Sequence, residues 1–83
     1  MDVLERIEIL IALEKVSKRE LSEKCAMKPD RWKNVLGKKA KLYQEDMEAL
    51  YKLWPEYKYW LTFGIEEPEK GQISPMTKKA TRS

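Results

Sequence analysis

Nine basic side chains gather in the middle of this 83-residue chain, within residues 18–41, where only three acidic side chains accompany them. The flanking segments are acidic, with a net charge of −2 over residues 1–17 and −5 over residues 42–69. Amines and guanidinium groups concentrated in one segment attract anions. The modest total charge of +3 therefore conceals a basic centre, which predicts an anionic partner docked on one face.

Other kinds of chemistry are excluded by what the chain lacks. It has no His and a single Cys, which excludes Cys/His zinc sites, Ser-His-Asp triads and His acid–base catalysis within one chain. A domain of this size buries only roughly 60% of its unfolded surface, leaving little room for an enclosed active site. We therefore expect no enzyme, no metal or cofactor, and no small-molecule substrate.

No membrane span or signal peptide is expected either. The longest apolar run, Ile9–Leu13, is far shorter than the roughly 20 residues that cross a bilayer. Asp2 and Glu5 stand where a signal peptide would carry basic residues. The expected location is the cytoplasm, and the single Cys is consistent with a reducing compartment.

Helical periodicity with start and stop signals predicts five helices and no convincing strand, so the predicted fold class is all-α. The helices are expected over residues 3–16, 18–25, 29–36, 44–54 and 56–63. Beyond them, Pro68, Gly71 and Pro75 punctuate a polar stretch without periodicity. We expect a compact domain over residues 1–65 and an extended or disordered tail over residues 66–83.

The first expected helix carries more apolar surface than one core face requires. One arc of it suits the core, while Ile9, Leu13 and Val16 form a second apolar arc on another side. This second arc is consistent with a helix wedged between other elements or with a dimer seam. The three tryptophans, Trp32, Trp54 and Trp60, stand at apolar helical positions and are expected in the core.

The elements that must position the basic side chains are the two short helices within residues 17–36. Ser17 and Glu20 form the spacing of a capping box at the start of the first. Pro29 suits the first position of the second helix, and Gly37 suits its end. So short a connection makes the helices cross steeply, as in a helix-turn-helix, whose second helix can enter the DNA major groove.

Residues 17–36, S-K-R-E-L-S-E-K-C-A-M-K-P-D-R-W-K-N-V-L, resemble the helix-turn-helix of lambda-repressor-like domains. These domains include phage Cro and repressor proteins and regulators of the xenobiotic-response-element type. Residues 57–64, Y-K-Y-W-L-T-F-G, resemble the end of that family's fifth helix. Residues 68–75, P-E-K-G-Q-I-S-P, resemble a tail associated with small prophage-encoded members. The resemblance implies a compact five-helix domain that binds DNA.

The resemblance also implies roles for individual positions. Leu21, Cys25, Trp32 and Val35 take buried places, and Ser22 takes the small-residue place in the first motif helix. The polar candidates fall into three groups. Lys18, at the start of the first motif helix, is the expected phosphate contact. The base-reading positions are Lys28, Asp30 and Asn34, with Arg31 and Lys33 beside them, and the phosphate-holding loop contains Lys38, Lys39 and Lys41.

Three residues depart from the family pattern. Ala26 stands where Gly is usual at the turn, so a left-handed conformation there costs energy. Trp32 is larger than the Ile or Val expected, and Pro29 removes one donor from the front of the reading helix. These departures affect the identity of the base contacts more than the fold.

The leading hypothesis is a sequence-specific transcriptional regulator of phage or prophage type. It would bind a double-stranded, near-palindromic operator as a homodimer through the major groove, in the cytoplasm of the bacterial host. The alternative is a phage-encoded protein–protein interaction module that inhibits a host defence or regulatory protein, since a fold alone does not settle function.

Overall fold

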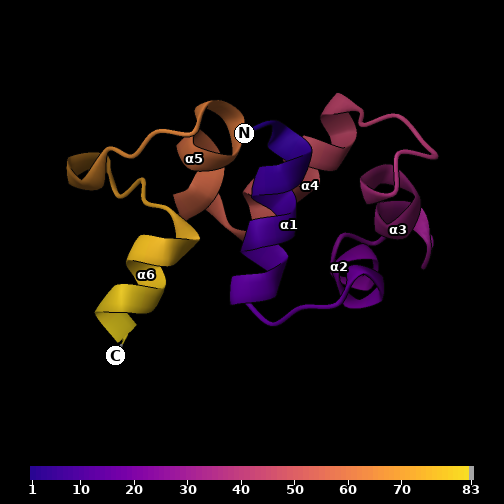
Figure 1. Ribbon diagram of the computed structural model, residues 1–83, viewed down its shortest axis with the longest axis horizontal. Coiled ribbons are helices and arrows are strands. Elements are labelled where there is room, and N and C mark those ends of the chain that lie inside the picture. The colour runs from indigo at the N-terminus through magenta and orange to yellow at the C-terminus, as the bar shows by residue number, and fades with distance from the viewer. Residues whose placement is uncertain (83) are drawn as a thin grey trace.

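Short helices make up nearly all regular structure in the part of the chain that the computed structural model describes, which is residues 1–82, with side chains for residues 1–80. Within it, an isolated bridge between Glu67 and Gln72 is the sole strand-like pairing. The all-α prediction is confirmed (Figure 1). The elements are α1 (Val3–Leu13), α2 (Lys18–Lys24), α3 (Arg31–Leu36), α4 (Gln44–Leu53), the 3-10 helix η1 (Pro55–Tyr57), α5 (Lys58–Phe63), the 3-10 helix η2 (Pro68–Lys70) and α6 (Pro75–Arg82).

Capping residues set where the first two helices begin. The Asp2 carboxylate accepts a hydrogen bond of 2.8 Å from the Glu5 N–H, and Glu5 accepts one in return from the Asp2 N–H. Ser17 and Glu20 repeat this arrangement at α2, with the Ser17 hydroxyl 3.0 Å from the Glu20 nitrogen. The capping box predicted at Ser17 is therefore confirmed. Each box satisfies backbone donors that the first turn of a helix leaves without partners.

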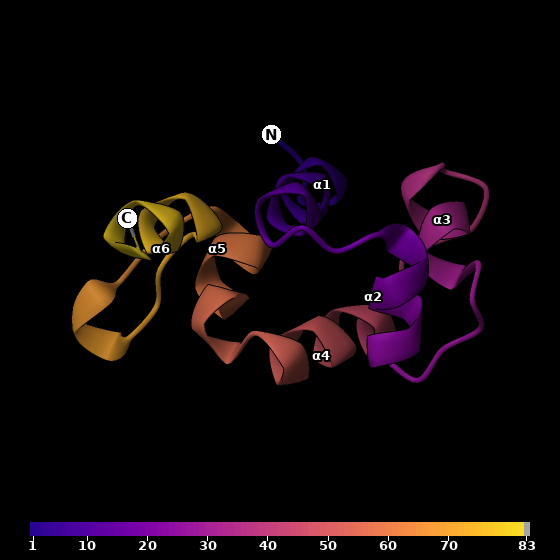
Figure 2. The same ribbon diagram turned by 90° about the horizontal axis from the view of Figure 1, so that it is seen from below.

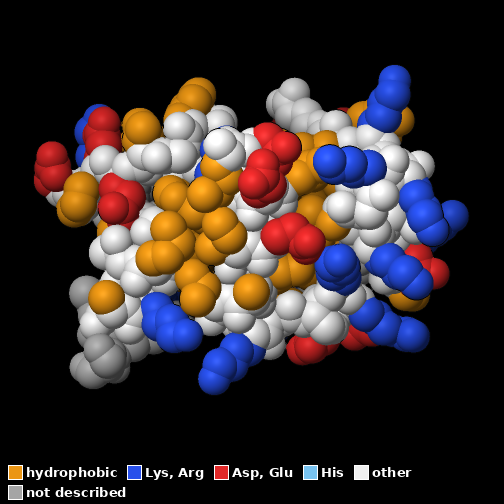
Figure 3. All heavy atoms as spheres, in the orientation of Figure 1, with side chains coloured by type: hydrophobic (Ala, Val, Ile, Leu, Met, Phe, Trp, Pro, Cys, Tyr) orange, Lys and Arg blue, Asp and Glu red, His pale blue; other side chains and the backbone are white. Residues whose placement is uncertain are grey.

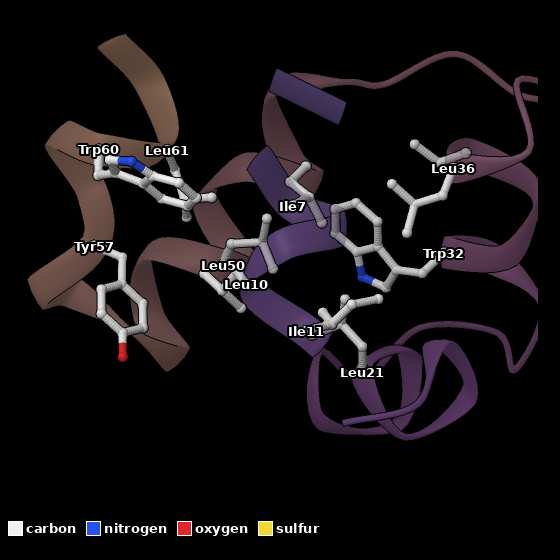
Figure 4. Packing of buried hydrophobic residues seen from close by; sticks show 11 residues of the cluster. Ile7, Leu10, Ile11, Leu21, Trp32, Leu36, Leu50, Tyr57, Trp60 and Leu61 are labelled. Carbon is white, nitrogen blue, oxygen red and sulfur yellow. The ribbon is translucent and has the colours of Figure 1, made fainter. Parts of the chain in front are cut away.

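One hydrophobic core runs through the molecule along α1 (Figure 4). Trp32 and Trp60 are buried in it, as predicted, while Trp54 is half-buried with its ring 6.4 Å from that of Tyr57. The buried apolar side chains are Ile7, Leu10, Ile11, Leu21, Trp32, Val35, Leu36, Leu50, Tyr57, Trp60 and Leu61.

Helix α1 lies between the two ends of the molecule and is covered on more than one side. It packs against α5 and also against α6, which lies beside it in both ribbon views (Figure 2). Of the two interpretations of its second apolar arc, the wedged helix agrees with this arrangement. A further bond ties it to α5, because the Arg6 guanidinium donates to the carbonyls of Leu61 and Thr62 at 2.9 and 3.3 Å.

The expectation of an extended or disordered tail over residues 66–83 is wrong for the described part of that segment. The chain there forms η2, turns back through the bridge between Glu67 and Gln72, and ends in α6. Ser83 lies outside the described residues. The lack of sequence periodicity misled because the segment is held by polar contacts and a few apolar ones, which leave no regular apolar face.

Those contacts fasten the segment to η1 and α5. The Gln72 carboxamide accepts from the Tyr59 N–H and donates to the Pro55 carbonyl, both at 2.9 Å. The Ile73 N–H donates to the Glu56 carbonyl at 2.9 Å, while the Ile73 side chain packs against the core. Lys78 on α6 forms an ion pair with the Glu56 carboxylate. The segment is therefore part of the folded unit.

Deleting residues 66–83 should lower the free energy of unfolding by about 2 kcal/mol or more. Full burial of an aliphatic side chain contributes about 1.5–3 kcal/mol, of which the partly buried Ile73 supplies a part. The deletion also removes the buried Pro75 and the bonds made by Gln72. Chemical denaturation monitored by circular dichroism measures the loss. Lys79→Ala, an exposed change on α6, is the control. A truncated chain as stable as the full chain would contradict the assignment.

Candidate nucleic-acid interface

Helices α2 and α3 pack against each other across a tight turn. The turn closes through a hydrogen bond of 2.9 Å from the Met27 N–H to the Ser22 carbonyl. Ala26 adopts a left-handed conformation with φ of 56°, as its place in the turn predicted. For a residue with a Cβ this conformation costs roughly 1–2 kcal/mol, so the packing of the two helices must offset it.

A small residue and a large one hold α3 on α2. Ser22 is fully buried. Its hydroxyl accepts a hydrogen bond from the backbone N–H of Trp32 at 3.1 Å and donates one to the Lys18 carbonyl at 3.1 Å. The Trp32 ring is fully buried among side chains of α1 and α2, including Ile11 and Leu21 (Figure 4). The predicted buried place of Trp32 and small-residue place of Ser22 are both confirmed.

Cys25 ends α2 at the edge of this packing and is half-buried. Burial raises the pKa of its thiol by more than the neighbouring Trp32 indole N–H lowers it. The thiol therefore stays protonated near neutral pH and behaves as a small packing group.

The start of α3 differs from the expectation. Pro29 lies in the turn rather than in the first helical position, and α3 begins at Arg31 with Asp30 as its N-cap residue. The Asp30 side chain makes no capping bond, and it is exposed. This carboxylate is therefore available at the surface in front of α3.

The end of α3 differs as well. Gly37 has an ordinary φ of −82°, and the left-handed residue is Lys38, with φ of 62°. A Cβ at Gly37 would lie 3.0 Å from the Lys33 carbonyl oxygen, so any larger residue there would require a small local shift. After this turn the N–H groups of Lys39 and Ala40 both donate to the Asn34 carbonyl, at 2.8 and 3.1 Å. The lysines of the following loop are thus fixed directly to the end of α3.

Most of the site residues predicted from the sequence surround α3 with exposed side chains. Within the described part of the chain, the cations among them make no ion pair, apart from Lys18 and Arg31. Lys18 forms a long pair of 3.7 Å with Glu8, both side chains being about half exposed. The exposed members are Lys28, Asp30, Lys33, Lys38, Lys39 and Lys41.

Asn34 lies at the centre of this group. It is half-buried, and no described residue hydrogen-bonds its carboxamide, which lines an open groove of about 750 Å³ beside the turn. Lys28, Pro29 and Asp30 line the same groove. In the space-filling view, Lys and Arg side chains gather over the end of the molecule that holds α2 and α3 (Figure 3). This end of the molecule therefore presents positive charge around the Asn34 carboxamide, which no described residue hydrogen-bonds.

Arg31 is the exception among the predicted site residues. Its guanidinium forms a two-pronged ion pair with Asp46 of α4, with Nε to Oδ1 at 3.0 Å and Nη2 to Oδ2 at 2.5 Å, and also donates to the Lys41 carbonyl at 2.8 Å. The ring of Tyr43 lies 5.3 Å from the guanidinium carbon. Arg31 is therefore bound within the fold, whereas the neighbouring Lys33 has an exposed side chain.

Asp46 is the residue that the sequence analysis missed. Its side chain is almost fully buried, and it also accepts the Tyr43 N–H at 2.8 Å. Burial opposes its charged form, but the hydrogen bonds from Arg31 and the Tyr43 backbone together hold its pKa below the ordinary value. An acid in the first turn of a helix is commonly explained by the helix dipole alone, so no pattern in the sequence indicates the ion pair.

The described residues show no sign of a metal site or of a membrane span. They contain no group of three or more metal-ligating side chains, and none of their helices has the length and apolar character needed to cross a bilayer.

Together these features define a small all-α protein with a basic two-helix unit at one end. No model of a known protein family matches the chain, and no curated protein matches it. Among solved structures, it is similar to Pf6r from the filamentous phage Pf6 of Pseudomonas aeruginosa PA01. The two chains are 32% identical, the match covers 99% of this chain and 95% of that chain, and the TM-score is 0.77. The chain belongs to the same family as this phage protein.

The coverage of 99% includes the C-terminal segment with η2 and α6. That segment is therefore part of the architecture shared with the phage protein, which agrees with its packing here.

Ser22→Ala should destabilise the protein by about 1–3 kcal/mol, because it leaves the buried backbone N–H of Trp32 without its acceptor. Thermal and urea unfolding measure the change. Glu23→Ala, at the exposed neighbouring position of α2, is the matched control and should change stability by less than about 0.5 kcal/mol. Equal stability of the Ser22 variant and the parent chain would show that water or another group satisfies the donor.

Proposed function

We propose that the chain is a phage-type transcriptional regulator that binds duplex DNA in a sequence-specific manner through its α2–α3 unit. The observation that carries the proposal is the arrangement around α3. Exposed cations without ion-pair partners in the described structure surround Asn34, whose carboxamide is uncommitted and borders an open groove. The family relationship to a filamentous-phage protein supports the phage assignment.

The two helices would act as a helix-turn-helix of the lambda-repressor-like kind, with α3 in the major groove. A major groove about 12 Å wide admits one helix, and its base edges offer distinct hydrogen-bonding patterns. Asn34 can form a bidentate pair with adenine, while the Asp30 carboxylate can accept from cytosine N4. Lys28 and Lys33 supply further donors at the same surface.

Other cations would hold the DNA backbone. Lys38, Lys39 and Lys41 lie in the loop that leaves α3, whose start is bonded to the Asn34 carbonyl, so they would meet phosphates beside the groove. Lys18 would exchange its long pair with Glu8 for a phosphate. An exposed pair of this kind is worth only about 0–1 kcal/mol, so the exchange costs little.

A homodimer completes the proposal, because such domains bind two half-sites about 34 Å apart. The molecule is 35 Å long, a size compatible with two copies side by side at that spacing. Exposed apolar side chains support an interface at the corner between α1 and α5, where Met1 is 71% and Phe63 70% exposed. Arg6 on α1 joins the N-terminus to α5 at this corner, because its guanidinium donates to the carbonyls of both Met1 and Leu61. Operator occupancy in the bacterial cytoplasm would then block or recruit polymerase.

The proposal is tested by selecting bound sequences from a random duplex pool and then measuring affinity against salt. If about four to six cations per protomer meet phosphates, log affinity should fall with log salt by about 0.9 for each phosphate neutralised. The selected sites should be near-palindromic. Absence of binding to any duplex at low salt, or a flat salt response with retained affinity, would contradict the proposed function.

Variants separate base reading from phosphate contact. Asn34→Ala should cost roughly 1–3 kcal/mol on the selected operator and much less on random duplex, because the carboxamide pairs with a base. Lys39→Ala should weaken binding to both duplexes alike and reduce the salt slope, because a loop lysine reaches only the backbone. Fluorescence anisotropy with both duplexes measures the difference. Equal losses on the two duplexes for both variants would leave only a non-specific basic patch.

A further inference from the structure

We propose that Asp46 is a positioning residue for DNA recognition, acting through Arg31 on both the reading helix and the lysine loop. The inference rests on the DNA binding proposed above. In this proposal Arg31 does not contact DNA. Its bonds to Asp46 and to the Lys41 carbonyl, here called the clamp, connect α3 to α4 and to the loop between them, so α4 influences specificity without carrying a DNA-reading residue.

The geometry places three structural elements on one guanidinium. Arg31 is the first residue of α3, Asp46 lies in the first turn of α4, and the Lys41 carbonyl belongs to the loop between them. The bond to Asp46 fixes α3 against α4, and the bond to Lys41 fixes the loop against both. The Asp46 carboxylate in turn accepts the Tyr43 N–H at the loop's end.

The burial of the pair separates positioning from contact. Asp46 borders the groove beside Asn34, but its side chain is only 5% exposed and both its oxygens are occupied, by Arg31 and by the Tyr43 N–H. The Arg31 side chain is 23% exposed. Any effect of Asp46 on DNA binding must therefore pass through the groups it holds. A planar guanidinium bonded through two nitrogens is also geometrically stricter than an ammonium ion.

The clamp matters for recognition because α3 has few constraints of its own. The helix has six residues, and its N-cap side chain makes no bond. Asn34 lies one turn after Arg31, so a rotation or shift at the start of α3 moves the Asn34 carboxamide relative to the base edges. Release of Lys41 moves the phosphate-holding loop. Specific binding depends on the positions of both the Asn34 carboxamide and the lysine loop, whereas non-specific binding needs only the positive charge.

The test compares Asp46→Asn with Glu45→Gln, which removes the same charge from an exposed neighbour in the same turn. On the selected operator, the Asp46 variant should lose about tenfold in affinity relative to random duplex, a loss of the size expected when a positioned contact is disturbed. The Glu45 variant should keep the parent ratio within twofold. Amide exchange of Lys39 and Ala40, measured without DNA, should quicken in the Asp46 variant alone.

Arg31→Lys provides the second variant, because it keeps the charge but not the two-pronged geometry. It should reproduce the loss caused by Asp46→Asn, and the double variant should be no worse than either single variant, since both remove one clamp. If Arg31 instead touches DNA, Asp46→Asn frees the guanidinium and preserves or improves operator binding. That result, in a variant shown to be folded by circular dichroism, would overturn the inference.

One measurement needs no variant and decides the case if Asp46→Asn does not fold. The Arg31 Nε–H resonance of the parent chain should keep its chemical shift when operator is added, because its acceptor is Asp46 in both states. A large shift would mean that the guanidinium changes partner on DNA, and it would overturn the inference alone. Failure of the parent chain to bind any duplex would instead overturn the proposed function on which the inference rests.

Discussion

The burial of Trp32 is the constraint on which the arrangement of this molecule depends. A six-residue helix is too short to be stable in water by itself, so α3 exists because something outside it holds it. The Trp32 ring does so from the core between α1 and α2 (Figure 4), and the backbone N–H of Trp32 donates to the buried Ser22 hydroxyl. The left-handed Ala26 is tolerated because this packing closes the turn.

Once Trp32 is fixed inward, the directions of its neighbours follow from helical geometry. Val35 and Leu36, three and four residues later, share the buried side, and Lys33 is exposed. Arg31, one position earlier, is turned toward α4, where it meets Asp46. The basic surface is thus arranged by the buried Trp32 and by the Arg31–Asp46 ion pair, while its exposed lysines make no ion pair in the described structure.

The elements that the sequence predicts correctly are those set by nearby residues. Ser17 and Glu20 are three positions apart, and Ala26 stands in a turn between two well-defined helices, so local chemistry decides both. The end of α3 is different, because Gly37 has an ordinary φ and the left-handed residue is Lys38. Residues 66–82 are placed by partners in η1 and α5, such as Glu56, which no local pattern indicates.

The same distinction applies to the site. Residue type and position indicate which side chains could meet an anion, but they do not show which of these side chains already have partners within the fold. Arg31 and Asp46 are fifteen positions apart, and their pairing depends on how the intervening loop closes through the Lys41 carbonyl. Among the described residues that surround α3, the exposed cations are all lysines, which offer point charges rather than planar forks. In the proposed DNA complex, Asn34 and Asp30 would carry most of the discrimination between bases and the lysines most of the affinity. Arg31, at the front of α3, would hold the two groups in a fixed relation through its bonds to Asp46 and the Lys41 carbonyl.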